Sequence, residues 1–225
     1  MKTVKIIVRW LFILCVPALL LTVSVSTAMN CRWLYQYGFN KYDISQVTGL
    51  APAELEKAAD GLIQYFNSSE EYISLTVIKD GKPFTLFNER EVNHLKDVKE
   101  LFQLVYKILI GTGVYALVFL GVSIFWWRDK RRLGWELLGG GGLTLALMAA
   151  LGIMLALDFD WFFLQFHLFS FANDFWQLNP MTDYLIMLFP QGFWFDATLF
   201  CAGGTAAIAL ILGGVGWWMR RKYNI

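Results

Sequence analysis

The chain has 225 residues, of which 57% are hydrophobic and 16% charged, whereas soluble domains are close to half apolar and a quarter charged. This composition indicates a membrane protein and excludes a disordered chain, which needs low hydrophobicity and high net charge. The net charge of +1 gives no basic field for nucleic acid, and the three cysteines, without a CxxC pair, exclude a disulfide scaffold, a zinc ribbon and a thioredoxin-like motif.

Four uncharged stretches are long enough to cross a bilayer, which takes about 20 apolar residues in a helix. They are Trp10–Ala28, Ile108–Trp127, Leu137–Leu157 and Ala197–Met219. With flanking residues included, we predict transmembrane helices at 6–29, 104–127, 137–157 and 197–219. The expected fold is therefore an all-α membrane protein with four transmembrane helices. The four uncharged stretches themselves contain no Asp, Glu, Lys, Arg or His, which argues against a transporter.

The first span also has features of a cleaved signal peptide. Lys2 and Lys5 precede its apolar run, and Ser26-Thr27-Ala28 follows at the position of a cleavage site. The apolar run is longer than that of most signal peptides, and three further spans follow. We therefore favour an uncleaved anchor.

Lysine and arginine near the span ends predict the orientation, because cytoplasmic segments carry an excess of both. Basic residues gather before the first span, in the link at 128–136 and in the tail at 220–225. These clusters share one side of the membrane only if both termini and the 128–136 loop are cytoplasmic. Residues 30–103 and 158–196 then lie outside.

Residues 30–103 are expected to form a small extracytoplasmic cap of mixed α and β structure. Pro52 suits the first turn of a helix, and the apolar face of that helix comprises Leu55, Ala59, Leu62, Ile63 and Phe66. Tyr72–Ile78 and Pro83–Phe87 flank Asp80-Gly81, a pattern typical of a β-hairpin. From Glu91 the helical spacing returns and leads into the second span.

Residues 158–196 are rich in aromatic side chains for a loop, with 14 of them among the 37 positions from Phe159 to Phe195. The uncharged run Trp161–Asn173 is too short to span, so we expect it to lie in the membrane interface or to re-enter partway. An aromatic belt is one interpretation. The polar residues within the segment favour a lipid-binding or substrate-binding pocket.

The two histidines of the chain, His94 and His167, lie in these two outer segments. Imidazole titrates near neutral pH and serves as a general acid or base. Glu91 shares a helical face with His94 and is a candidate to orient it, and Asp97 is the other near neighbour. The alternative for these residues is a structural hydrogen bond or a solvated helix face.

Other chemistry has weaker support in the sequence. The two histidines with Asp174 or Asp183 could supply three metal ligands, but neither HxH nor HxxxH spacing is present. No GxSxG motif occurs, and Cys15 and Cys201 lie within spans, where a buried thiol is usually inert.

Two sequence blocks carry a family resemblance. The first is Phe-Asn-Glu-Arg-Glu-Val-Asn-His-Leu-Lys-Asp-Val-Lys at 87–99, and the second is FHLFSFANDFWQLNPMTDYLIMLFP at 166–190. Both blocks resemble the bacterial membrane family that includes lipoprotein intramolecular transacylase. The layout of four spans with a cap between the first two fits that family as well.

The resemblance implies an acyltransferase that moves the sn-2 acyl chain of a diacylglyceryl-cysteine to its α-amino group, giving the lyso-form lipoprotein. It implies that His94 and His167 are catalytic. By analogy with the family, His94 is the base and His167 the electrostatic partner, although the opposite assignment stays open. Candidate substrate-binding residues in the second block are Phe166, Phe171, Asn173, Trp176 and Asp183.

The same resemblance implies partners and location. We expect lipoproteins and membrane lipid as partners, the bacterial cytoplasmic membrane as location, an active site on its outer face, and no cofactor or metal. Two functions of other classes stay open. One is a non-catalytic accessory protein whose cap binds a partner, and the other is a metal-dependent membrane hydrolase.

Overall fold

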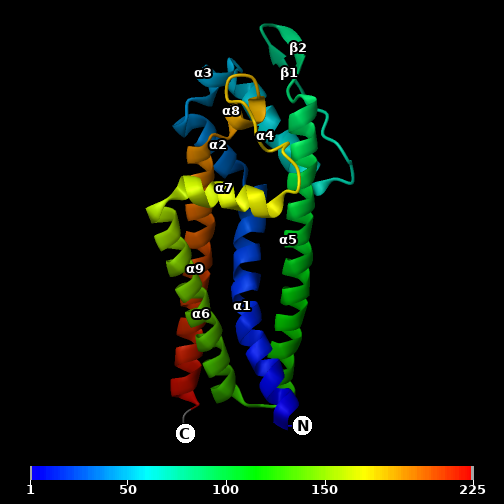
Figure 1. Ribbon diagram of the computed structural model, residues 1–225. Coiled ribbons are helices and arrows are strands. Elements are labelled where there is room, and N and C mark those ends of the chain that lie inside the picture. Colours follow the sequence, from blue (N-terminus) through cyan, green and yellow to red (C-terminus); the bar gives the residue numbers. More distant parts are fainter. Residues whose placement is uncertain (1, 224–225) are drawn as a thin grey trace. The chain divides into compact units, whose positions relative to one another are not determined.

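The computed structural model describes residues 2–223, and long helices dominate them (Figure 1). Four helices are long and apolar enough to cross a membrane, namely α1 (Lys2–Asn30), α5 (Glu89–Gly121), α6 (Lys130–Leu157) and α9 (Gln191–Lys222). A π-helical turn, Val122–Trp126, extends α5. The predicted membrane protein with four long apolar helices is confirmed.

The chain divides into two compact units. Residues 1–26, 104–157 and 199–225 make up the first, called here the transmembrane unit. Residues 27–103 and 158–198 make up the second, called here the histidine unit. The histidine unit thus combines the predicted cap with the predicted aromatic segment, two stretches that two spans separate in the sequence.

The core of the transmembrane unit draws on all four long helices. Phe12, Val16 and Leu20 recur every four residues on α1, which places them on one face of the helix. They pack with residues of the other three helices, namely Ala116, Phe119, Leu133, Leu137 and Ala209. The rings of Phe12 and Phe119 stack with centroids 4.2 Å apart.

Glycine lets the helices of this unit approach closely. A Cβ added to Gly141 of α6 would lie 2.8 Å from the carbonyl oxygen of Ala209 in α9. No side chain larger than hydrogen fits there, so the two backbones are in direct contact. Close helix packing therefore explains the glycine at this position of the run at 139–142.

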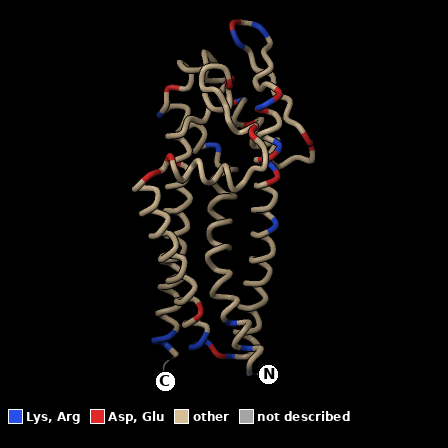
Figure 2. The backbone as a smooth tube through the Cα atoms, viewed as in Figure 1, with Lys and Arg blue, Asp and Glu red and all other residues tan. Residues whose placement is uncertain are grey.

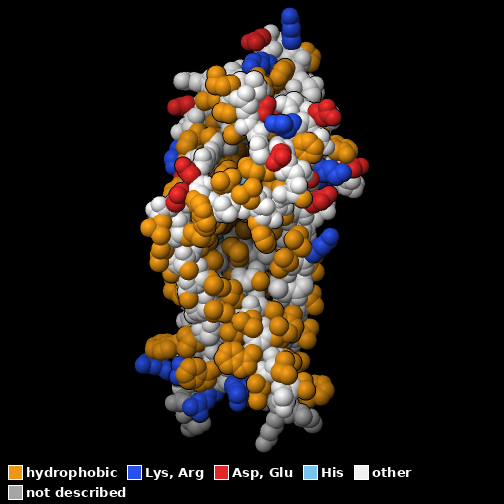
Figure 3. All heavy atoms as spheres, viewed as in Figure 1, with side chains coloured by type: hydrophobic (Ala, Val, Ile, Leu, Met, Phe, Trp, Pro, Cys, Tyr) orange, Lys and Arg blue, Asp and Glu red, His pale blue; other side chains and the backbone are white. Residues whose placement is uncertain are grey.

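Lysine and arginine gather where α1 begins and α9 ends (Figure 2), whereas apolar side chains cover most of the visible face of the transmembrane unit (Figure 3).

The predicted loop at 128–136 is wrong from residue 130 onward, because α6 begins at Lys130 and contains Glu136. Glu136 is only 4% exposed, and its carboxylate lies 3.3 Å from the guanidinium of Arg9 on α1. This ion pair stabilises the charge of Glu136 within the helix, whereas hydropathy alone places Glu136 in a loop.

The histidine unit consists of short helices, one hairpin, the first turns of α5 and α9, and the end of α1. Its other elements are α2 (Arg32–Lys41), α3 (Ile44–Thr48), α4 (Pro52–Asn67), β1 (Thr76–Lys79), β2 (Lys82–Thr85), α7 (Phe159–Ser170) and α8 (Tyr184–Leu188). Pro52 begins α4 as predicted, and most of the predicted apolar face of that helix is buried. Ile63 is the exception, because it is only half-buried.

The predicted hairpin is confirmed, although its strands are shorter than expected. β1 pairs with β2 in antiparallel register, with Val77 opposite Phe84 and Lys79 opposite Lys82. Asp80 and Gly81 form the two-residue turn, and their φ angles are +51° and +75°. Two positive φ angles are what a type I′ hairpin turn requires, which explains the Asp-Gly pair.

The uncharged aromatic run forms the short helix α7. The side chain of Asp158 caps its first turn, because Oδ1 accepts a hydrogen bond of 2.9 Å from the backbone N–H of Trp161. His167 is the one buried residue of this helix, whereas Phe169 is 95% exposed. Helix α7 therefore exposes an apolar surface and buries a single imidazole.

Candidate active site

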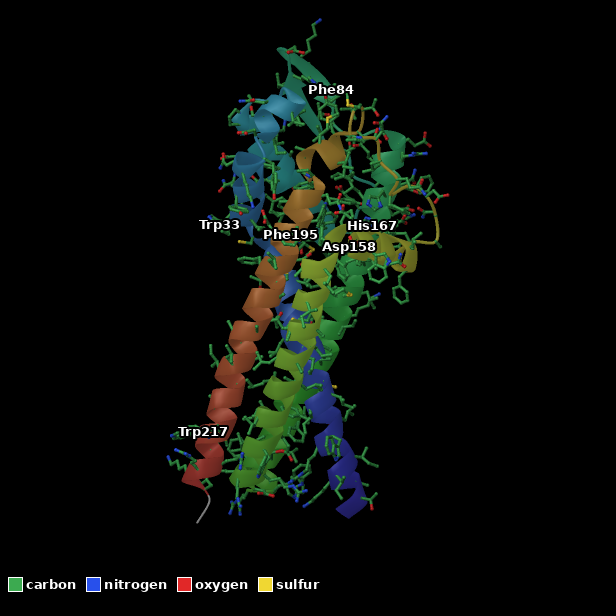
Figure 4. The ribbon with its side chains drawn as sticks, turned by 60° about the vertical axis from the view of Figure 1, so that its left-hand side comes forward. Trp33, Phe84, Asp158, His167, Phe195 and Trp217 are labelled. Atoms are coloured by element: carbon green, nitrogen blue, oxygen red, sulfur yellow. The ribbon has the colours of Figure 1, made fainter. Side chains whose placement is uncertain are left out.

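The fold brings the two histidines together within the histidine unit. His94 lies in the second turn of α5 and His167 near the end of α7, where Figure 4 labels it. Their ring centroids are 6.2 Å apart, and the ring planes are inclined by 33°. Their exposed fractions are 7% and 8%. Two buried imidazoles from different helices thus form the centre of the candidate site.

A backbone contact fixes the tautomer of His167. Its Nδ1 lies 2.7 Å from the carbonyl oxygen of Phe163, one turn earlier in α7. A carbonyl oxygen only accepts, so Nδ1 donates its proton to this bond and Nε2 carries a free lone pair. Burial lowers the pKa of His167, and the bond to Phe163 partly opposes that shift. His167 is therefore a neutral imidazole with a basic Nε2.

His94 has a different environment. Its buried Nδ1 has no hydrogen-bond partner among the residues that the structure describes. The ring packs edge-on against Phe171, with centroids 5.0 Å apart. Buried polar atoms are rarely left without a partner in folded proteins, so this nitrogen is suited to a bond with a bound substrate.

Aromatic side chains surround the two imidazoles. The ring of His167 has four aromatic neighbours, namely Phe163 at 4.4 Å, Trp176 at 5.1 Å, Phe166 at 5.4 Å and Phe171 at 5.6 Å between centroids. Three of them are candidates from the sequence. Phe163 was not among those candidates, and its position four residues before His167 on one helix face was the signal that could have identified it.

Glu91 does not orient His94, contrary to the prediction. Its buried carboxylate, 1% exposed, accepts hydrogen bonds from the backbone N–H groups of Asn88 at 2.7 Å and Leu185 at 2.6 Å. The first bond, together with that from the Glu91 N–H to Asn88 Oδ1 at 3.1 Å, forms a capping box at the start of α5. The second bond joins α8 to α5, so Glu91 supports the site by connecting these two helices.

Asn173 and Asp183 bond to protein groups instead of to the imidazoles. The Asn173 amide donates to Asp97 Oδ2 at 2.9 Å. The carboxylate of Asp183 accepts three hydrogen bonds, from the Asn179 backbone, the Asn88 side chain and the Thr182 hydroxyl. Both residues therefore fix the conformation of the segment that follows α7.

The alternative metal site lacks a ligand cluster. Within the described residues 2–223, no three His, Cys, Asp or Glu side chains lie close enough to hold one ion. Asp183 in particular is saturated by hydrogen bonds from its own surroundings. The two histidines and an aspartate do not form the three-ligand set considered from the sequence.

Comparisons with known proteins match the whole fold. The chain matches the family described as "Lipoprotein intramolecular transacylase Lit" over residues 10–194. The structure of the membrane integral lipoprotein intramolecular transacylase from Bacillus cereus superposes with a TM-score of 0.84, at 19% identity, covering 100% of this chain and 99% of that chain. A structure of the same protein with one histidine replaced by alanine has a TM-score of 0.79, at 17% identity, covering 99% and 96%.

A curated relative is less informative about function. It is an uncharacterized protein of Aquifex aeolicus (strain VF5), 31% identical over 126 residues, which are 56% of this chain and 53% of that protein. The chain thus spans about half the length of the curated relative that it matches.

Proposed function

Because this chain belongs to the lipoprotein intramolecular transacylase family, we propose that it moves an acyl chain within a diacylglyceryl-modified lipoprotein. The acyl group leaves the sn-2 oxygen of the glyceryl unit and is transferred to the α-amino group of the same N-terminal cysteine. The observation that carries this proposal is the pair of buried imidazoles, His94 and His167, 6.2 Å apart within an aromatic shell.

The reaction needs no nucleophile from the protein. The amino nitrogen attacks the ester carbonyl, the carbon–nitrogen bond forms, and the carbon–oxygen bond to the glyceryl unit breaks. The proton lost by nitrogen ends on the glyceryl oxygen, so the product is an isomer of the substrate. Donor and acceptor are joined through a ring of about eight atoms, and holding them in attack geometry supplies much of the acceleration.

The hydrogen bond of His167 favours it as the general base. Its Nε2 is free to take the proton of the attacking amine, because Nδ1 is committed to the Phe163 carbonyl. The Nδ1 of His94 has no protein partner among the described residues, which suits it to a bond with the ester oxygen as negative charge develops there. This assignment reverses the order suggested by the family resemblance.

The aromatic shell contributes by excluding water. Hydrolysis of the same ester competes with transfer, since water is an alternative nucleophile. Phe166, Phe171 and Trp176 offer apolar surface next to His167 and no hydrogen-bond acceptor that would hold water there. In our proposal these three side chains contact the substrate, whereas Asn173 and Asp183 support the segment that carries two of them.

Charge distribution supports a location for the reaction. Lysine and arginine gather at the end of the transmembrane unit where α1 begins and α9 ends (Figure 2), which favours cytoplasmic termini. We therefore place the protein in the bacterial cytoplasmic membrane, with the membrane lipid and lipoproteins of its outer face as partners.

Mass spectrometry of a reporter lipoprotein tests the function. The reporter is co-expressed with this chain, with His94→Ala or with Asn93→Ala in a host that lacks N-acyltransferase. We expect an N-terminal lipopeptide of unchanged mass whose fragments place one acyl chain on the cysteine nitrogen, with the wild type and Asn93→Ala only. An unmodified diacylglyceryl peptide in all samples, with the wild-type protein folded in the membrane, would refute the proposal and favour the non-catalytic accessory function.

A further inference from the structure

The segment Phe171–Asp183, called here the strap, connects α7 to α8 and contains neither helix nor strand. The strap packs two aromatic rings against the imidazoles of the two histidines. Phe171 contacts both imidazoles, with centroid distances of 5.0 Å to His94 and 5.6 Å to His167. Trp176 lies 5.1 Å from His167. The environment of the reacting groups therefore depends on where the strap lies.

Side chains from α5 and its N-cap hold the strap in place. Asn88 donates to Asp183 at 3.0 Å, and the guanidinium of Arg90 donates to the backbone carbonyl of Gln177 at 2.9 Å. The third bond joins the Asn173 amide to the carboxylate of Asp97 at 2.9 Å. All three α5-side partners belong to the helix that carries His94 or to its cap, so the histidine and the strap share one support.

The Asp97–Asn173 bond is best placed to control the rings. Asp97 follows His94 by three residues, which is just under one helical turn, so both side chains lie on the same face of α5. Asn173 lies between Phe171 and Trp176 in the strap. The acceptor in this bond is a carboxylate oxygen, and hydrogen bonds to a carboxylate are stronger than bonds between neutral groups.

We propose that Asp97 and Asn173 are positioning residues whose hydrogen bond keeps the strap closed over His94 and His167, so that the amine and not water receives the acyl group. This inference rests on the proposed transacylase function. With the strap loosened, water attacks the same ester carbonyl and the bond from the acyl carbon to the glyceryl oxygen breaks. A free fatty acid is released and the glyceryl hydroxyl keeps a proton, with water as the only co-reactant.

A charge exchange tests the bond directly. Asn173→Asp places two carboxylates opposite each other, and the second change, Asp97→Asn, restores an amide facing a carboxylate. The assay follows the purified variants in detergent with a synthetic diacylglyceryl lipopeptide, and it measures N-acylated product against released fatty acid. Glu100→Gln is the matched control, because it removes an exposed carboxylate from the same helix.

We expect Asn173→Asp to raise the ratio of fatty acid to N-acylated product about tenfold, the factor that corresponds to about 1.4 kcal/mol. The double variant should return to within about threefold of the wild-type ratio. The Glu100→Gln variant should match the wild type. A variant that merely lost stability would form less of both products without changing their ratio. In that case the double variant would not restore the amounts of product.

Two results would overturn the inference while leaving the proposed function intact. One is an unchanged product ratio in a folded Asn173→Asp variant that still makes N-acylated lipopeptide. The other is a changed ratio that Asp97→Asn does not correct. Absence of N-acylated product from the wild type itself would instead contradict the transacylase function on which the inference rests.

Discussion

His94 and His167 form an asymmetric pair, since one imidazole has a backbone partner and the other has none. Nδ1 of His167 donates to Phe163, whereas Nδ1 of His94 is buried without a partner among the described residues. The two rings nevertheless lie 6.2 Å apart with similar burial. The difference in hydrogen bonding gives the two histidines different chemical roles, and replacements can separate those roles.

We expect His167→Asn to remove catalysis while preserving the fold. The amide nitrogen of asparagine replaces Nδ1 and can still donate to the Phe163 carbonyl, but asparagine offers no basic nitrogen. Loss of a general base should slow transfer about 100-fold or more. The lipopeptide assay measures that rate, and thermal unfolding in detergent checks the fold. A folded His167→Asn variant with nearly full activity would disprove the base role.

The pH dependence of transfer should follow the substrate amine more than the enzyme. Burial lowers the pKa of His167, so this imidazole stays neutral below the usual histidine range of about 6.5. The α-amino group must lose its proton to attack, and its reference pKa is about 7.7 to 8.0. We therefore expect kcat/KM to rise with pH up to about 8. If kcat/KM instead reached its plateau at pH 6.5, its rise would reflect the titration of an unperturbed histidine.

The lowered pKa of His167 also makes the stability of the protein depend on pH. Below pH about 6.5 an unfolded chain protonates His167 more readily than the folded protein, because the folded-state pKa is lowered. The contribution of His167 to the free energy of unfolding should therefore fall as the pH drops from about 6.5 toward the folded-state pKa, and stay constant above that window. Comparing the midpoints of thermal unfolding of wild type and His167→Asn across this range isolates the contribution, which should be absent in the variant.

Glu91→Ala should destabilise the histidine unit. It leaves the backbone N–H of buried Leu185 without its acceptor and removes the capping box with Asn88. Hydrogen bonds to charged groups contribute about 1.5 to 3 kcal/mol each, so we expect a loss of about 3 kcal/mol. Glu91→Gln keeps one acceptor oxygen and should lose less. The control is Glu89→Ala, which truncates an exposed carboxylate in the same turn, and equal midpoints for Glu89→Ala and Glu91→Ala would contradict the assigned role.

Neighbouring glycines of α6 should respond differently to alanine. A Cβ at Gly141 would meet the backbone of Ala209 and Gly213 on α9 at 2.8 and 3.1 Å, whereas a Cβ at Gly142 meets nothing within 4 Å. Backbone atoms cannot move aside as a side chain does, so Gly141→Ala should cost about 1 to 3 kcal/mol. Gly142→Ala should be neutral. Unfolding midpoints in detergent decide the matter, and similar values for both variants would remove close packing as the reason for Gly141.

Local patterns in the sequence were enough for most elements. Hydropathy identified four apolar helices, because only helices satisfy their backbone hydrogen bonds inside lipid. Pro52 marked the start of α4, and Asp80-Gly81 marked the hairpin turn, because both preferences depend on backbone angles of the residues themselves. The start of α6 was misplaced, since the charge of Glu136 is compensated by a distant residue, Arg9.

The sequence by itself thus determined the spans, the hairpin and the family motifs that contain both histidines. Only the tertiary structure decided that residues 27–103 and 158–198 fold into one unit, and that His94 and His167 meet there. It also decided that Glu91, Asn173 and Asp183 support the site through bonds to protein groups. The physical reason is that hydropathy and turn preferences act over a few residues, whereas the partner of a buried polar group is chosen by contacts between distant segments.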